Sequence, residues 1–211
     1  MVTPIEGNLY QFTNLAGNMS LPSNQYLLAT SPSVMFATGI YDQAKWILPK
    51  VKEILGDRPL DYLFISHLEA DECGGVFLFK KHFPKLVILS TARIATELPG
   101  FGYKGKIIPC DKDGSFTHGP IDLKFYGFPV EVHNRDGLIC YETNNGVLYS
   151  SDVIVKNSRS SIDLDDWDHE IEGIDASRIP DDSRREHLKD QLRTIKPKLI
   201  ATGHGACVKI E

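Results

Sequence analysis

The sequence has 211 residues, of which 42% are hydrophobic and 24% are charged, a balance typical of a globular domain. A formal net charge of −5 argues against binding to nucleic acid or to an anionic membrane, because such surfaces concentrate lysine and arginine. The N-terminus lacks the basic and apolar segments of a secretory signal, and no apolar run reaches the length of a membrane span. We therefore expect a cytoplasmic protein without a membrane segment.

The first half of the chain alternates between predicted strands and helices. Two short apolar runs, at 25–30 and 34–38, flank a Ser-Pro-Ser turn and predict a β-hairpin. Residues 42–55 carry apolar side chains at helical spacing and are followed by Gly56, which predicts a helix that ends there. The elements predicted next are a strand at 60–66, a helix at 75–82, a strand at 85–90 and a helix from Thr91.

The second half is richer in strands. Between 106 and 153, apolar runs alternate with Asp-Gly and Asn-Asn-Gly turn signals. The acidic segment 156–180 is predicted to be a loop, followed by a charged helix at 181–195 and a strand at 199–202. No linker or repeat interrupts the pattern. The sequence thus predicts one α/β domain spanning 1–211, built mainly from two sheets.

Metal-capable side chains gather directly after the strand at 60–66, in a segment that reads His-Leu-Glu-Ala-Asp-Glu-Cys-Gly-Gly from His67. Side chains 67, 69 and 71 alternate, so an extended or turning backbone can direct them to one point, and the two glycines permit a sharp bend. A histidine beside acids is usually part of a solvated loop, but the buried strand before it favours a metal site. Cys73 in this segment is interpreted as a structural thiol.

Three further ligand-type residues stand at the ends of predicted strands. His133 follows an apolar run and begins a turn, Asp152 ends the run 146–151, and His204 lies between two glycines after the last strand. Each alone is more often structural than functional. Together they indicate a site assembled by several loops at strand ends.

This pattern resembles the metallo-β-lactamase superfamily, whose motif is His-x-His-x-Asp-His, and within it the diiron domain of flavodiiron and oxygen-binding diiron proteins, whose motif is His-x-Glu-x-Asp-His. Glu69 at the second position is the diagnostic feature, and the resemblance covers nearly the whole chain. It implies an αββα sandwich with two metal ions. One metal would be held by His67, Glu69 and His133, the other by Asp71 and His204, with Asp152 bridging.

The sequence departs from the family pattern at two positions. Glu72 stands where a histidine ligand of the second metal is expected, and it could bind that metal, act through water or leave the metal weakly held. Ala37 stands where the superfamily often has an aspartate that supports the metal loop. We therefore expect the surroundings of the ligands to differ from those of the family.

The resemblance implies two iron ions that bind dioxygen or nitric oxide, either to reduce the gas or to sense or carry oxygen, in a homodimer. Carboxylates suit harder cations, which favours iron, although zinc or manganese is compatible with the set. No Gly-rich phosphate loop opens a helix, so we expect no FMN site in this chain and electrons from a separate flavodoxin- or rubredoxin-like donor. The alternative is a zinc-dependent hydrolase of the superfamily, acting on a thioester, lactone or phosphoester.

Overall fold

Two seven-stranded sheets form the frame of the computed structural model, which describes residues 1–14, 22–128, 137–158 and 160–211. The strands of the first sheet follow the chain order: β1 (Val2–Glu6), β2 (Leu9–Asn14), β3 (Ser23–Leu28), β4 (Val34–Phe36), β5 (Tyr62–Phe64), β6 (Val87–Ser90) and β7 (Lys106–Pro109). β1 to β4 pair antiparallel, whereas β4 to β7 pair in parallel. Parallel neighbours require long crossover connections, and the chain supplies helices for them.

The second sheet has the order β12-β14-β13-β11-β10-β9-β8. Its strands are β8 (Ser115–His118), β9 (Ile121–Phe128), β10 (Gly137–Glu142), β11 (Val147–Ser151), β12 (Ile162–Asp165), β13 (Leu199–Thr202) and β14 (Cys207–Ile210). β11 and β13 are parallel neighbours, and Ser151 pairs with Thr202. The segments that carry Asp152 and His204 therefore leave the sheet side by side, at the C-terminal ends of these two strands.

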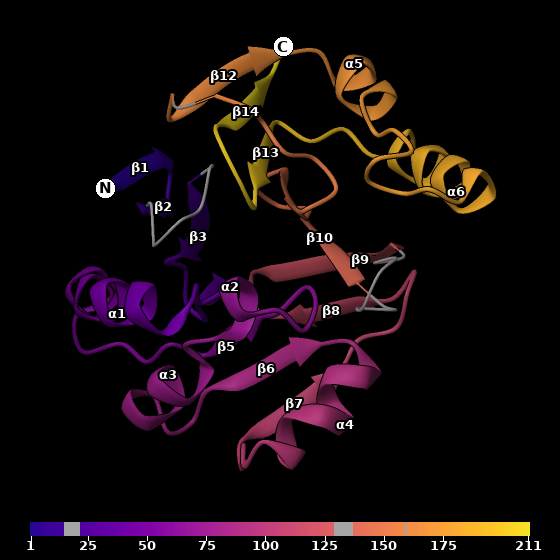
Figure 1. Ribbon diagram of the computed structural model, residues 1–211. Coiled ribbons are helices and arrows are strands. Elements are labelled where there is room, and N and C mark those ends of the chain that lie inside the picture. Colours follow the sequence, from indigo (N-terminus) through magenta and orange to yellow (C-terminus); the bar gives the residue numbers. More distant parts are fainter. Residues whose placement is uncertain (15–21, 129–136, 159) are drawn as a thin grey trace.

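Helices cover the outer face of each sheet (Figure 1). They are α1 (Tyr41–Leu55), α2 (Ala70–Cys73), α3 (Val76–His82), α4 (Ala92–Gly100), α5 (Trp167–Glu172) and α6 (Asp182–Leu192). α1, α3 and α4 bury apolar side chains against the first sheet, whereas α5 and α6 bury theirs against the second. Tyr26, Phe64 and Tyr149 lie in a third cluster between the sheets. This confirms the two-sheet α/β domain predicted from the residue pattern and the αββα sandwich implied by the family resemblance.

Local sequence explains most of these elements. α1 buries Ala44, Ile47 and Val51 on one face, and it ends at Gly56, whose φ of +61° stops the helix. The hairpin, α1, α3, α4, α6 and β13 lie where the sequence predicted them, within a few residues, whereas β14, which follows the strand predicted at 199–202, was not predicted. Within the described residues, no helix combines the length and the apolar character needed to cross a membrane.

The prediction of a loop at 156–180 was wrong, because this segment contains β12 and α5. β12 is an edge strand whose apolar residues Ile162 and Leu164 point to solvent, so the usual pattern of buried alternation is missing. α5 begins at Asp166, whose side chain accepts hydrogen bonds from the backbone N–H groups of Asp168 and His169. Acidic residues that suggested a loop thus form the start of a helix.

Candidate metal centre

The first ligand loop leaves β5 and bends into α2. The carbonyl oxygen of Ser66 accepts a hydrogen bond from the backbone N–H of Leu138 on the second sheet, so the loop lies where the two sheets meet. After α2 the chain passes so close to α1 that a Cβ on Gly75 would lie 2.2 Å from the Cβ of Ala44. This close packing explains why the predicted bend requires glycine.

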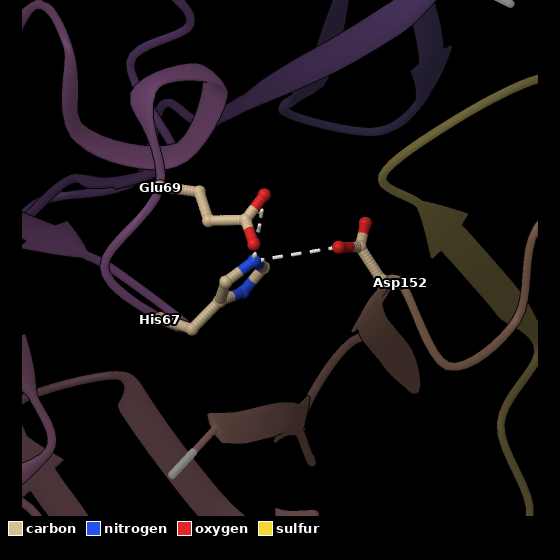
Figure 2. A group of neighbouring side chains, drawn as sticks. All are labelled: His67, Glu69 and Asp152. Atoms are coloured by element: carbon tan, nitrogen blue, oxygen red, sulfur yellow. Dashed lines mark ion pairs between the residues drawn. The ribbon is translucent and has the colours of Figure 1, made fainter. Parts of the chain in front are cut away.

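His67, Glu69 and Asp152 bring their ligand atoms together, as Figure 2 shows. The Nε2 atom of His67 lies 3.3 Å from Oδ2 of Asp152 and 3.7 Å from Oε2 of Glu69. His67 is 1% exposed, and this Nε2 atom is buried without a hydrogen bond. A buried nitrogen without a hydrogen bond is costly unless a cation or donor satisfies it, so the arrangement fits a metal ligand.

The second oxygen of Asp152 faces the other described histidine of the site. Oδ1 of Asp152 lies 3.5 Å from Nε2 of His204, and Oδ2 of Asp71 lies 3.2 Å from the same nitrogen. Asp152 therefore stands between His67 and His204 and presents one oxygen to each. A carboxylate in this position has the geometry needed to bridge two cations.

The His204 loop is fixed mainly by its backbone. The carbonyl oxygen of His204 accepts from the N–H of Lys156, and the side-chain amide of Asn24 donates to the carbonyl oxygens of Thr202 and Gly205. Gly205 has a φ of +81°, and a Cβ there would lie 1.7 Å from the carbonyl oxygen of Lys156. Glycine is thus required for this loop to pass beside the segment that follows Asp152.

Glu72 is buried, with 4% of its surface exposed, and protein donors surround its carboxylate. Oε1 accepts hydrogen bonds from the hydroxyl of Tyr149 at 2.7 Å and from the hydroxyl of Ser151 at 3.0 Å. Oε2 accepts from the backbone N–H of Ser66 at 3.2 Å. Sequence reasoning missed Tyr149 and Ser151, because neither belongs to a recognisable motif.

The charges of the site shift one another's pKa values. Burial disfavours the imidazolium of His67, but the surrounding carboxylates outweigh burial and raise the pKa of His67 to about 9. Burial raises the pKa of the Glu72 carboxyl to about 7. At Asp71, burial is outweighed by His204, which lowers the pKa of the Asp71 carboxyl. The carboxylates outnumber the imidazoles among the described side chains, and a bound divalent cation would offset the excess negative charge.

Three further residues were singled out from the sequence: His133, Ala37 and Cys73. His133 lies outside the described residues. Ala37 is buried and cannot supply the carboxylate that the superfamily often has at this position. The buried carboxylate next to the metal loop is instead that of Glu72. The Sγ atom of Cys73 donates to the carbonyl oxygen of Glu69, and burial raises the pKa of this thiol to about 12. Both observations fit the interpretation of Cys73 as a structural thiol.

A second group of ligand-type residues, Asp165, His169 and Glu170, lies on β12 and α5. The ammonium group of Lys156 forms ion pairs with the carboxylates of Asp165 and Glu170. His169 forms a further ion pair with Asp165 at 2.7 Å. A lysine already occupies the place of a cation, so this group is a salt-bridge cluster.

Comparisons with known proteins identify the family and the fold. The model of the ODP family beta lactamase matches residues 21–205. An uncharacterized protein of Methanocaldococcus jannaschii is 30% identical over 178 residues, which are 80% of this chain and 38% of that protein. The nitric oxide reductase of Moorella thermoacetica is 24% identical over 200 residues, which are 86% of this chain and 48% of that protein. The rubredoxin-oxygen oxidoreductase of Megalodesulfovibrio gigas is 24% identical over 145 residues, which are 68% of this chain and 36% of that protein.

The chain thus spans less than half the length of each of these relatives. Among solved structures, a diflavin flavoprotein A 5 fragment from Nostoc has a TM-score of 0.80 at 17% identity, covering 99% of this chain and 89% of that one. The flavoprotein of Thermotoga maritima has a TM-score of 0.80 at 18% identity, covering 99% and 57%. A metallo-beta-lactamase from Pontibacter korlensis scores 0.66 at 19% identity, covering 99% and 93%. These likenesses show the fold.

Proposed function

Because the chain belongs to the ODP beta-lactamase family, we propose that it is a flavodiiron-type core, a non-haem diiron protein that binds and reduces dioxygen or nitric oxide with electrons from a separate donor. The observation that carries this proposal is the buried Nε2 atom of His67, which makes no hydrogen bond and faces carboxylate oxygens of Glu69 and Asp152. Two relatives named nitric oxide reductase and rubredoxin-oxygen oxidoreductase support the class of substrate and of donor.

The proposed ligands fall on two sides of Asp152. His67 and Glu69 would hold one metal, and Asp71 and His204 would hold the other. Asp152 would bridge them, since its two oxygens face the two histidines. The family resemblance assigns His133 to the first metal, and we keep it as a proposed ligand.

Mixed carboxylate and imidazole donors favour iron over softer metals. Two iron ions held by these residues would supply the redox chemistry that no side chain of the centre provides. The side chains of Glu69 and Asp152 are each 34% exposed, so a small gas molecule can reach the site from this side, while His67 is closed to water.

The proposal is tested by anaerobic purification, metal analysis by mass spectrometry, and optical spectra recorded as air is admitted. We expect about two irons per chain and a new near-ultraviolet absorption on exposure. Consumption of dioxygen or nitric oxide is then measured with a chemical reductant and with reduced rubredoxin. The variant His67→Ala should lose the absorption, whereas His187→Ala, which changes an exposed histidine on α6, should retain it.

Zinc at one or two ions per chain with a featureless spectrum would reject the diiron proposal and favour the hydrolase of the same superfamily. If iron binds dioxygen reversibly and the dioxygen is not consumed in the presence of a reductant, the chain would be assigned as a carrier or sensor. Rapid gas consumption would assign it as a reductase.

A further inference from the structure

The carboxylate of Glu72 is positioned to act on His67 through Ser151. Both of its oxygens accept hydrogen bonds from the protein, from Tyr149 and Ser151 on one oxygen and from the Ser66 backbone on the other. A carboxylate that left these three donors to bind a metal would leave two buried hydroxyls and a buried N–H without this partner, which is costly. These three donors fix the position of both carboxylate oxygens within the protein.

The hydroxyl of Ser151 links Glu72 to His67. This hydroxyl has one proton, which it donates to Oε1 of Glu72 at 3.0 Å. The Nδ1 atom of His67 lies 3.4 Å from the same hydroxyl oxygen. With its proton already donated, this oxygen can only accept a hydrogen bond from the ring N–H. The direction of the first hydrogen bond thus sets the direction of the second.

The tautomer of His67 follows from this order of donors. A proton on Nδ1 leaves the lone pair of Nε2 free, and Nε2 is the buried atom that makes no hydrogen bond and faces Glu69 and Asp152. Histidines that bind metals commonly donate their other ring N–H to a fixed acceptor, which sets the tautomer and the ring orientation. Here the hydroxyls of Ser66 and Ser151 each lie 3.4 Å from Nδ1, and the buried carboxylate of Glu72 orients that of Ser151 as an acceptor.

We propose that Glu72 is a positioning residue and not a metal ligand, and that through Ser151 it fixes His67 in the tautomer that presents Nε2 to the metal. This inference rests on the metal centre of the proposed function. It also accounts for the glutamate at a position where the family resemblance expects a histidine ligand: the side chain at position 72 points into the protein and orients a neighbouring ligand.

The test is an anaerobic titration of the metal-stripped protein with Fe²⁺ in competition with a chelator, for wild type and variants. The variant Ser151→Ala should still bind two ions, one of them about 10–100-fold more weakly, as for other losses of a partner of a metal-bound histidine. Glu72→Gln keeps an oxygen that accepts from Ser151 and should bind like wild type. Glu72→Leu removes the acceptor and should match Ser151→Ala, and combining the two changes should add little.

Proton NMR detects the Nδ1–H proton of His67 directly. In the Zn²⁺-loaded protein, which is diamagnetic, the Nδ1–H resonance of His67 should be visible and protected from exchange in wild type and in Glu72→Gln. It should exchange faster in Ser151→Ala and be lost when Ser66, whose hydroxyl also lies 3.4 Å from Nδ1, is changed to alanine as well. The matched control is Glu142→Gln, another buried glutamate, which accepts from the Asn144 and Asn145 N–H groups at the other end of β10 and should leave both readouts unchanged.

Two outcomes would overturn the inference while leaving the metal centre intact. The first is that Glu72→Gln binds one ion where wild type binds two, which would make Glu72 a ligand. The second is that Ser151→Ala binds metal and shows the Nδ1–H resonance as wild type does, which would remove the link. A wild-type protein that binds no divalent metal would instead reject the proposed function itself, and this inference with it.

Discussion

The two described histidines of the site are held by different means. His67 is 1% exposed, and buried side chains, Ser151 and behind it Glu72, approach its ring. His204 has a side chain that is 17% exposed, and its loop is held through its backbone groups, which bond to other backbone groups and to the Asn24 amide, and by a glycine that no larger residue can replace without displacement. Side-chain chemistry positions one half of the centre, and backbone geometry positions the other. Different substitutions should therefore break each half.

The largest effect is expected where the halves meet. Asp152→Asn would remove the charge from the carboxylate that, among the described residues, faces both His67 and His204. We expect the affinity for both ions to fall by more than about 100-fold, beyond the 10–100-fold loss typical of changes next to a ligand. Metal content after gel filtration measures this. Asp122→Asn, at a surface contact with Thr143, should keep full metal content, and metal loss in that variant would show a general fold defect.

Gly205→Ala tests the half of the centre that backbone geometry positions, the His204 loop. Its Cβ would collide with the carbonyl oxygen of Lys156, and alanine is strained at a φ of +81°. Strain and overpacking together should lower the free energy of unfolding by about 2–4 kcal/mol and weaken one metal position. Urea unfolding and Fe²⁺ titration measure the two effects. Gly102→Ala, with a φ of +95° and open space around it, should cost only the strain and leave both metals.

Tyr149→Phe tests the half of the centre that buried side chains position, His67 with Ser151 and Glu72 behind it. It removes the hydroxyl that donates to the buried carboxylate of Glu72 at 2.7 Å. A hydrogen bond to a charged acceptor contributes about 1.5–3 kcal/mol, so urea unfolding of the metal-stripped variant, at a pH above the Glu72 pKa of about 7, should show a loss in this range. Tyr141→Phe removes a hydroxyl that donates to an exposed carbonyl and should cost less than about 0.5 kcal/mol. Equal losses in both variants would contradict a special role for Glu72.

The smallest effect concerns the salt-bridge cluster beside the His204 loop. Asp165 raises the pKa of His169 above the unfolded value, so this ion pair stabilises the fold at acidic pH, and the stability is lost as pH rises through the folded pKa. Wild type should exceed His169→Gln in unfolding free energy at about pH 5.5, and the difference should vanish near about pH 9. Because His169 is exposed, about 1 M salt should reduce the difference, and metal affinity should not change.

Local pattern predicted much of the fold, because apolar spacing in α1 and the central strands follows burial directly. It failed at β12 and α5, where an edge strand exposes its apolar residues and acids cap a helix. For the site, strand-end placement indicated His67, Asp152 and His204. The contact between Tyr149 and Glu72 could not be predicted, because it joins positions 77 residues apart through tertiary packing alone.

The ligand loops come from both sheets, with His67, Glu69 and Asp71 following β5 of the first sheet and Asp152 and His204 following β11 and β13 of the second. An ion bound among them would cross-link the two halves of the sandwich, and the unfolded chain has no such site. Linkage then adds about 2.7 kcal/mol of stability when free metal exceeds its dissociation constant about 100-fold. The melting temperature of this protein should therefore report the free metal concentration around it, with a chelator lowering it and added metal restoring it.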